Sequence, residues 1–241
     1  FAPGRRPSPG AAMVDIATRH PRLAVIMAGL ALGVTGWGLS GNRRAWPYLI
    51  VLVAVSSIAA LAGARDRLSG ATLTALVGLA GAHLVGGLVG APGGGGLPFY
   101  EHWLIEGVLK YDQLVHGLGT GILTVAVFEL IDGWWMPGTP RAVRHTMALA
   151  GALALGALNE VFEFVMAQRV AGLQIGDGAN TGWDLVFNLV GAGVVGLAVL
   201  PAWRTDGRTR WSSPAVGNAS SPTHPSDSFG DVVGGPGQRG S

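Results

Sequence analysis

The sequence lacks cysteine altogether and carries few charged residues. None of its 241 residues is cysteine, which excludes disulfides, zinc–thiolate sites and thiol nucleophiles. Charged residues make up 12% of the chain, about half the fraction usual in soluble domains, whereas 49% of residues are hydrophobic. Basic residues form no dense patch with interleaved aromatic side chains, so nucleic acid is not expected as a partner. The low charge and the 40 glycines favour a membrane protein.

Six apolar runs are long enough to cross a bilayer. They cover residues 23–39, 46–63, 71–89, 111–131, 143–166 and 183–200. Residues 99–110 mix aromatic and charged side chains, and we expect them to form a short helix at the membrane interface. The sequence therefore predicts an all-α polytopic transmembrane helix bundle over residues 23–203, in a multi-pass protein of the inner cell membrane. The polar segments 1–22 and 204–241 are expected to be disordered.

Arginine and lysine are distributed unevenly between the segments that connect the predicted spans. About 11 of them fall on one side of the membrane and about 4 on the other. Positively charged loops favour the cytoplasm, so both termini are expected to be cytoplasmic. The lipid bilayer is the expected partner, and nothing in the sequence specifies an oligomeric state.

Ionisable and amide side chains recur at one end of the last three predicted spans. Each span carries a pair that lies on one helix face, about one turn apart. These six residues, the polar cluster, are Asp112, His116, Glu160, Glu163, Asp184 and Asn188. Because consecutive spans cross the membrane in opposite directions, the three pairs are expected to meet in the outer leaflet. Glycines on or beside these faces would let the backbones approach closely. They are Gly117, Gly121, Gly156 and Gly191.

The charge of the polar cluster limits what it can bind. A carboxylate at mid-membrane costs roughly 2.5 to 3.5 kcal/mol, and four cannot all stay charged side by side without a counter-charge. Only Lys110 and Arg169 lie at the same rim. The remaining solutions are shared protons, a divalent cation or a cationic substrate. Carboxylate, imidazole and amide ligands suit Mg, Mn, Fe or Zn, so a divalent metal is a candidate cofactor without a fixed identity.

A structural interpretation stands beside each of these residues. Polar side chains in membrane bundles often only hydrogen-bond helices together, at about 0.6 kcal/mol each. Six at a common depth favour a site, whereas Glu129 and Asp132 at the other end of the fourth span are expected to be solvated boundary residues. His83 is expected to be a satisfied core histidine that could join the polar cluster.

Three short motifs resemble those of two membrane protein families. Asp112-x-x-x-His116, Glu160-x-x-Glu163 and Asp184-x-x-x-Asn188-x-x-Gly191 resemble the pattern of VanZ-like proteins and of the YjdF-like inner-membrane family. VanZ-like proteins carry Asp-Lys-x-x-His and Glu-x-x-Gln, whereas Gln113 and Glu163 stand at the Lys and Gln positions here. The resemblance covers residues 111–200 and is closer to the YjdF-like pattern. It implies little about activity, because the YjdF-like family has no settled activity. VanZ-like proteins are linked to glycopeptide resistance without an established reaction.

Three functions are compatible with this pattern. The first is an outer-leaflet site that binds a divalent cation or an envelope lipid head group, with metal-assisted hydrolysis or transfer. In that function the carboxylates and His116 would be ligands or acid/base groups, and Asn188 would orient them. The second is a small-solute or proton-coupled transporter, although no inverted repeat is visible. The third is a structural membrane subunit without catalysis. Whether the chain is an enzyme stays open.

Overall fold

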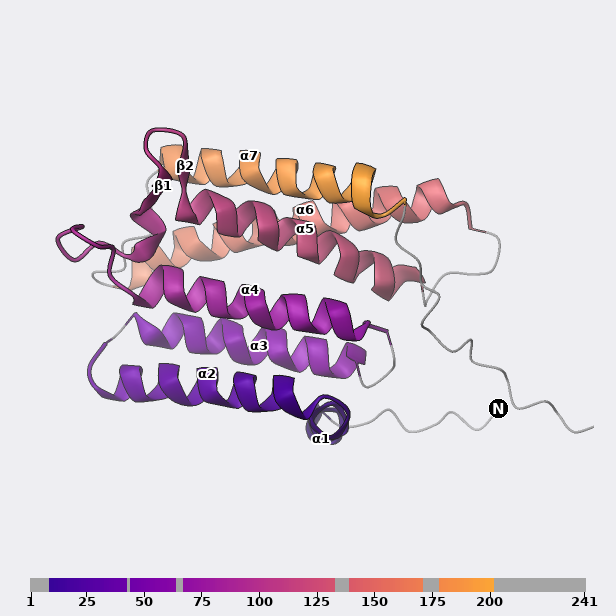
Figure 1. Cartoon of the computed structure of the whole chain (residues 1–241), viewed down its shortest axis with the longest axis horizontal. Coiled ribbons are helices and arrows are strands. Elements are labelled where there is room, and N and C mark those ends of the chain that lie inside the picture. The colour runs from indigo at the N-terminus through magenta and orange to yellow at the C-terminus, as the bar shows by residue number, and fades with distance from the viewer. Residues whose placement is uncertain (1–8, 43, 64–66, 133–138, 171–177, 202–241) are drawn as a thin grey trace, which may run out of the picture. The chain divides into compact units, whose positions relative to one another are not determined.

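The computed structural model describes residues 9–42, 44–63, 67–132, 139–170 and 178–201, which belong to one compact unit, Phe1–Arg208 (Figure 1). The predicted disordered tail, 204–241, and the first eight residues lie outside the described residues.

Helices make up nearly all of the described chain. In order they are α1 (Pro9–Arg19), α2 (Pro21–Leu39), α3 (Ala45–Gly63), α4 (Gly70–Leu88), α5 (Tyr111–Asp132), α6 (Arg141–Arg169) and α7 (Gly178–Val194). A π-helical turn, Val195–Val199, continues α7. Between α4 and α5 lie a 3₁₀ turn, Phe99–Glu101, and the short antiparallel strands β1 (Trp103–Ile105) and β2 (Leu109–Lys110).

Five described helices are long and apolar enough to cross a membrane. They are Pro21–Leu39, Gly70–Leu88, Tyr111–Asp132, Arg141–Arg169 and the continuous Gly178–Val199. The second predicted span forms α3, whose apolar stretch, Ala45–Ala60, is shorter than these five. The all-α polytopic architecture is thus confirmed. The cytoplasmic placement of the termini stays a prediction.

The N-terminal segment departs from the sequence analysis. The prediction of disorder over residues 1–22 is wrong for residues 9–19, which form α1. An ion pair between Asp15 and Arg19, one turn apart, supports this helix, and Ile16 packs against an apolar cluster that includes Leu73. The proline- and glycine-rich residues before α1 dominate the average composition and conceal a short run of good helix formers.

The segment before α5 also differs from the prediction, because residues 99–110 form a 3₁₀ turn followed by a hairpin rather than one interfacial helix. Gly107 adopts a φ of +69°, which suits a turn between two strands and interrupts a helix. The Lys110 ammonium closes the hairpin, since it lies 2.7 Å from Glu101 Oε2 and 5.4 Å from the centre of the Trp103 ring. The Lys110 backbone N–H then donates to Gln113 Oε1 at 2.9 Å, which caps the start of α5.

Helix α5 packs against α4, α6 and α7 and so lies at the centre of these helices (Figure 1). Its contact with α7 depends on glycine, because a Cβ on Gly191 would overlap the carbonyl group of Gly117. The predicted close approach of backbones at these two glycines is confirmed. In the C-terminal half of α5, Val125 and Phe128 pack with Ala148 of α6 and with Leu200 in an apolar cluster.

Candidate functional site

His116 lies at the centre of the polar cluster, with its two ring nitrogens facing different carboxylates. Nδ1 lies 3.1 Å from Oε1 of Glu160 on α6. Nε2 lies 3.4 Å from Oδ1 of Asp112, one turn earlier on α5, and 3.9 Å from Oε1 of Glu163. The structure thus brings both pairs from α5 and α6 together around one imidazole, of which only 5% is exposed.

Asp184 on α7 joins this group through Asn180, which lies one helical turn before it. The Asn180 amide nitrogen donates to Oδ2 of Asp112 at 2.9 Å and to Oδ2 of Asp184 at 2.6 Å. One oxygen of each aspartate is therefore held by the amide, and the other is left for a ligand. The sequence analysis did not include Asn180 in the polar cluster. Its spacing could have indicated it, because Asn180, Asp184 and Asn188 follow one another every four residues on a single face.

Asn188 lies in the same bundle but contacts other groups. Its Oδ1 accepts a hydrogen bond from Thr120 of α5, and its side chain lies against Gly156 of α6, where a Cβ would crowd it. In the described part of the chain it makes no hydrogen bond to the four carboxylates. Its described contacts therefore hold α5, α6 and α7 together one helical turn further along α7 than Asp184.

Four buried side-chain atoms of the polar cluster lack a hydrogen-bond partner among the described residues. They are His116 Nε2, Glu160 Oε1, Asp184 Oδ1 and Asn188 Nδ2. The 3.1 Å contact between Glu160 Oε1 and His116 Nδ1 is short, but it is not aligned as a hydrogen bond. Buried polar atoms are nearly always paired with protein, water or an ion, so four unpaired atoms in one place indicate an additional group.

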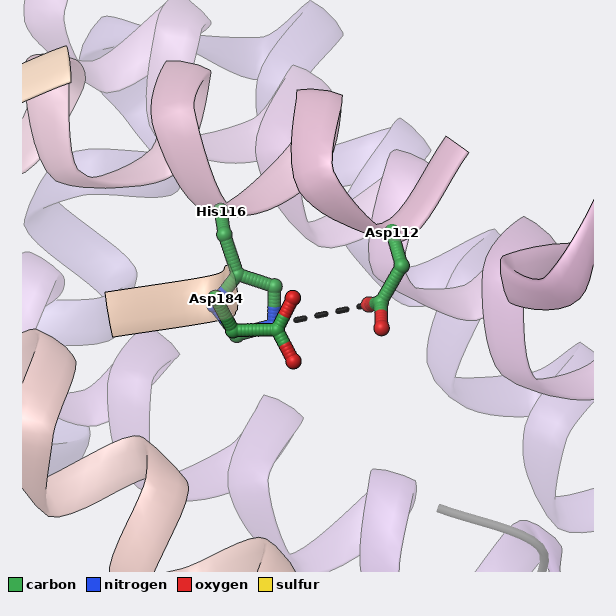
Figure 2. Close-up of side chains that lie close together, drawn as sticks. All are labelled: Asp112, His116 and Asp184. Carbon is green, nitrogen blue, oxygen red and sulfur yellow. Dashed lines mark ion pairs between the residues drawn. The ribbon is translucent and has the colours of Figure 1, made fainter. Parts of the chain in front are cut away.

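Three residues of the polar cluster lie close enough together to hold a metal ion. Asp112, His116 and Asp184 can each offer one ligand atom, and these atoms lie within 4.8 Å of one another. Figure 2 shows the two carboxylates and the imidazole turned toward one another. Ligands about 2.1 Å from a metal are roughly 3.4 Å apart in a tetrahedral site. The 3.4 Å between His116 Nε2 and Asp112 Oδ1 matches that spacing.

Neither of the two basic residues at the predicted outer rim is described in contact with the polar cluster. Lys110 pairs with Glu101, and Arg169 at the end of α6 is exposed. Arg144 pairs with Asp132 at the opposite end of α5. The counter-charge that the sequence analysis requires for four carboxylates is therefore not supplied by these three residues.

A second polar group from the first half of the chain borders His116. The ring of His83 on α4 lies 6.4 Å from the ring of His116, and its Nδ1 lies 2.7 Å from the Tyr100 hydroxyl. His83 is thus hydrogen-bonded, as predicted, and also adjoins the polar cluster. Burial raises the pKa of Tyr100 well above its ordinary value, so its phenol stays protonated and available as a donor.

The prediction that Glu129 and Asp132 are solvated boundary residues is wrong. Glu129 is only 2% exposed, and its Oε2 accepts a hydrogen bond of 2.8 Å from the backbone N–H of Ser69, the residue that caps α4. Asp132 is half-buried and forms an ion pair with Arg144 of α6. The two carboxylates therefore stabilise the packing of α5 against its neighbours, Glu129 with α4 and Asp132 with α6.

The chain belongs to a family described as "Predicted membrane protein (DUF2238)", which matches residues 21–206. This match includes the first three membrane helices as well as the polar cluster. It supports a multi-pass membrane protein and carries no statement of an activity. No curated protein and no solved structure matches the chain. The resemblance to VanZ-like and YjdF-like proteins stays a prediction.

Proposed function

We propose that this membrane protein binds a divalent cation between Asp112, His116 and Asp184. One observation carries the proposal: buried His116 Nε2 and Asp184 Oδ1 have no hydrogen-bond partner among the described residues, although both belong to one ligand set. A cation there would coordinate both atoms and offset the negative charge of the surrounding carboxylates, which is costly to bury uncompensated.

The donor set restricts the choice of cation. Two carboxylates and one imidazole mix oxygen with nitrogen, a combination typical of Mn²⁺, Fe²⁺ and Zn²⁺, whereas Ca²⁺ prefers six to eight oxygen ligands. Three protein ligands leave at least one coordination position open, as in catalytic rather than structural sites. When bound, such a cation supplies a Lewis acid at that position.

We propose an oxygen-rich lipid head group as the ligand of the open position, because these cations bind oxygen and the helices that carry the polar cluster are long and apolar enough to cross a bilayer. Glu163 is suited to accept a proton from a water or hydroxyl beside the cation. Its carboxylate lies 3.9 Å from His116 Nε2, is held by Asn159 at 2.7 Å and keeps 20% of its side chain exposed. It is therefore the most accessible acid in contact with His116, and hydrolysis or group transfer is the reaction class that these groups support.

The test is a binding titration of purified protein with Mn²⁺ and Zn²⁺ in detergent, combined with metal analysis. We expect one ion per chain, and a loss of affinity of more than about 100-fold in Asp184→Asn, because a ligand contributes at least as much as the groups that orient it. Asp132→Asn is the matched control, since it removes a carboxylate that the proposal does not use, and its affinity should equal that of the wild type. Absence of binding by the wild type, or equal affinities for Asp184→Asn and the wild type, would overturn the proposal.

A further inference from the structure

We infer that Glu160 is a positioning residue that accepts the Nδ1 proton of His116 and thereby makes Nε2 the nitrogen that binds the cation. The inference rests on the proposed cation site and deepens it. The two ring nitrogens of His116 face different carboxylates. Nδ1 lies 3.1 Å from Glu160, whereas Nε2 faces Asp112 at 3.4 Å and Glu163 at 3.9 Å.

The position of the proton on the imidazole decides which nitrogen can bind a metal. A neutral imidazole carries one proton, and only the nitrogen without it has a lone pair that can bind a metal. With the proton on Nδ1, His116 directs an N–H at Glu160 and a lone pair at the ligand set with Asp112 and Asp184. With the proton on Nε2, an N–H would occupy the space of the cation, and the Nδ1 lone pair would face a carboxylate oxygen.

Glu160 is suited to this role because it stands outside the ligand set. It comes from α6, whereas Asp112 and His116 come from α5 and Asp184 from α7. Its side chain is only 5% exposed, and its Oε1 has no hydrogen-bond partner among the described residues. Water is thus kept from this carboxylate, and the 3.1 Å separation puts its oxygen within reach of the Nδ1 proton. Carboxylates that hold the second nitrogen of a ligating histidine orient the ring and raise its basicity.

The experiment compares Mn²⁺ affinity in the wild type, Glu160→Gln and Glu160→Ala. Glu160→Gln keeps a side-chain oxygen that accepts the Nδ1 proton, so this variant should bind within about threefold of the wild type. Glu160→Ala removes the acceptor and should lose about 10- to 100-fold. Glu129 offers the matched control, because it is equally buried and holds a helix at the opposite end of α5. Glu129→Ala should leave the affinity of folded protein unchanged.

A second measurement reads the protonation of His116 in the wild type and needs a variant only to assign the signal. Nitrogen-15 NMR of histidine-labelled protein, with the His116 signal assigned by its loss in His116→Gln, reports which nitrogen carries the proton. We expect the Nδ1–H form once Zn²⁺ is bound, because the cation then takes the Nε2 lone pair. An Nε2–H form, full affinity in Glu160→Ala, or equal losses in Glu160→Gln and Glu160→Ala would overturn the inference. A wild type that binds no cation would overturn the proposed function instead, and the two failures are therefore distinct.

Discussion

Buried acids lie at both ends of α5, but only at the N-terminal end do described carboxylate oxygens lack a hydrogen-bond partner. At the C-terminal end, Glu129 accepts the Ser69 N–H and Asp132 pairs with Arg144. At the N-terminal end, Asp184 Oδ1 and Glu160 Oε1 lack hydrogen-bond partners among the described residues. Burial is similar, since Glu129 is 2% exposed and Glu160 is 5% exposed. At the C-terminal end the acids hold neighbouring helices together. At the N-terminal end the two unpartnered oxygens are the ones that we propose to interpret as part of a ligand site.

The segment of α5 between these ends bears on the transporter alternative. No ionisable residue occurs from Gly117 to Phe128. The hydroxyl groups of Thr120 and Thr124 lie within hydrogen-bond distance of carbonyl oxygens of their own helix, and the residues that follow are packed in an apolar core. A proton or ion path along α5 would need polar groups in that stretch. We therefore propose separate roles for the two ends of α5, ligand binding at the N-terminal end and helix assembly at the C-terminal end.

The largest effect is expected from Gly191→Ala, which tests whether the α5–α7 contact holds the N-terminal end of α5 together. The new Cβ would overlap the Gly117 carbonyl group, and backbone cannot yield as a flexible side chain does. We expect destabilisation by about 3 kcal/mol or more, measured by thermal unfolding in detergent. Gly193→Ala on the same helix is the control, because nothing lies within 4 Å of its Cβ, and it should be neutral or slightly stabilising. Equal behaviour of the two variants would contradict the close packing.

The next effect concerns the C-terminal end, where Glu129→Ala leaves the half-buried Ser69 N–H without its carboxylate. An unsatisfied buried donor costs about 1 to 3 kcal/mol, so the free energy of unfolding should fall by that amount. Glu129→Gln keeps an acceptor oxygen and should recover at least half of the loss. If both variants were as stable as the wild type, Glu129 would not stabilise the contact between α4 and α5. The two ends of α5 would then no longer differ in the role of their buried acids.

Local pattern explains why part of this organisation was predictable. The apolar runs identify the helices, and four-residue spacing identifies which side chains share a face, so the meeting of Asp112, Glu160 and Asp184 follows from helix direction alone. The close approach of Gly117 and Gly191 follows from their small size on the same faces.

The remainder depends on contacts between residues far apart in the sequence. The burial of Glu129 depends on Ser69, which lies 60 positions earlier, and no local spacing reveals that pair. The hairpin before α5 depends on the left-handed conformation of Gly107 and on the pairing of Lys110 with Glu101. The four-residue spacing could have placed Asn180 on the same face as Asp184. It could not have revealed the contact with Asp112, which lies 68 residues away on another helix.

A smaller effect is expected from Asn180→Ala, which tests how the two aspartates are oriented. The Asn180 amide holds one oxygen of Asp112 and one of Asp184, so its loss should let both carboxylates turn. We expect about a tenfold decrease in Mn²⁺ affinity, as is usual for groups that orient ligands. Asn159→Ala is the control, because Asn159 holds Glu163 outside the three-residue ligand set, and its effect should stay below about threefold. A larger loss of Mn²⁺ affinity in Asn159→Ala than in Asn180→Ala would indicate that the cation lies closer to Glu163 than proposed.

The smallest effect is expected on the free energy of unfolding in Asp184→Asn. The sign of this change distinguishes the two ends of α5. In a chelating buffer, Asp184→Asn removes one buried negative charge yet keeps an oxygen for the Asn180 amide, so thermal unfolding should show a gain of about 1 kcal/mol. With Mn²⁺ at 100 times its dissociation constant, the wild type gains about 2.7 kcal/mol that the variant lacks, and the order of stability reverses. Asp132→Asn should be destabilised in both buffers, because it loses its ion pair with Arg144 whether or not the metal is present. A loss of stability in Asp184→Asn under both conditions would make Asp184 a fastening residue like Glu129, and the polar cluster would then differ from the other end of α5 only in its composition.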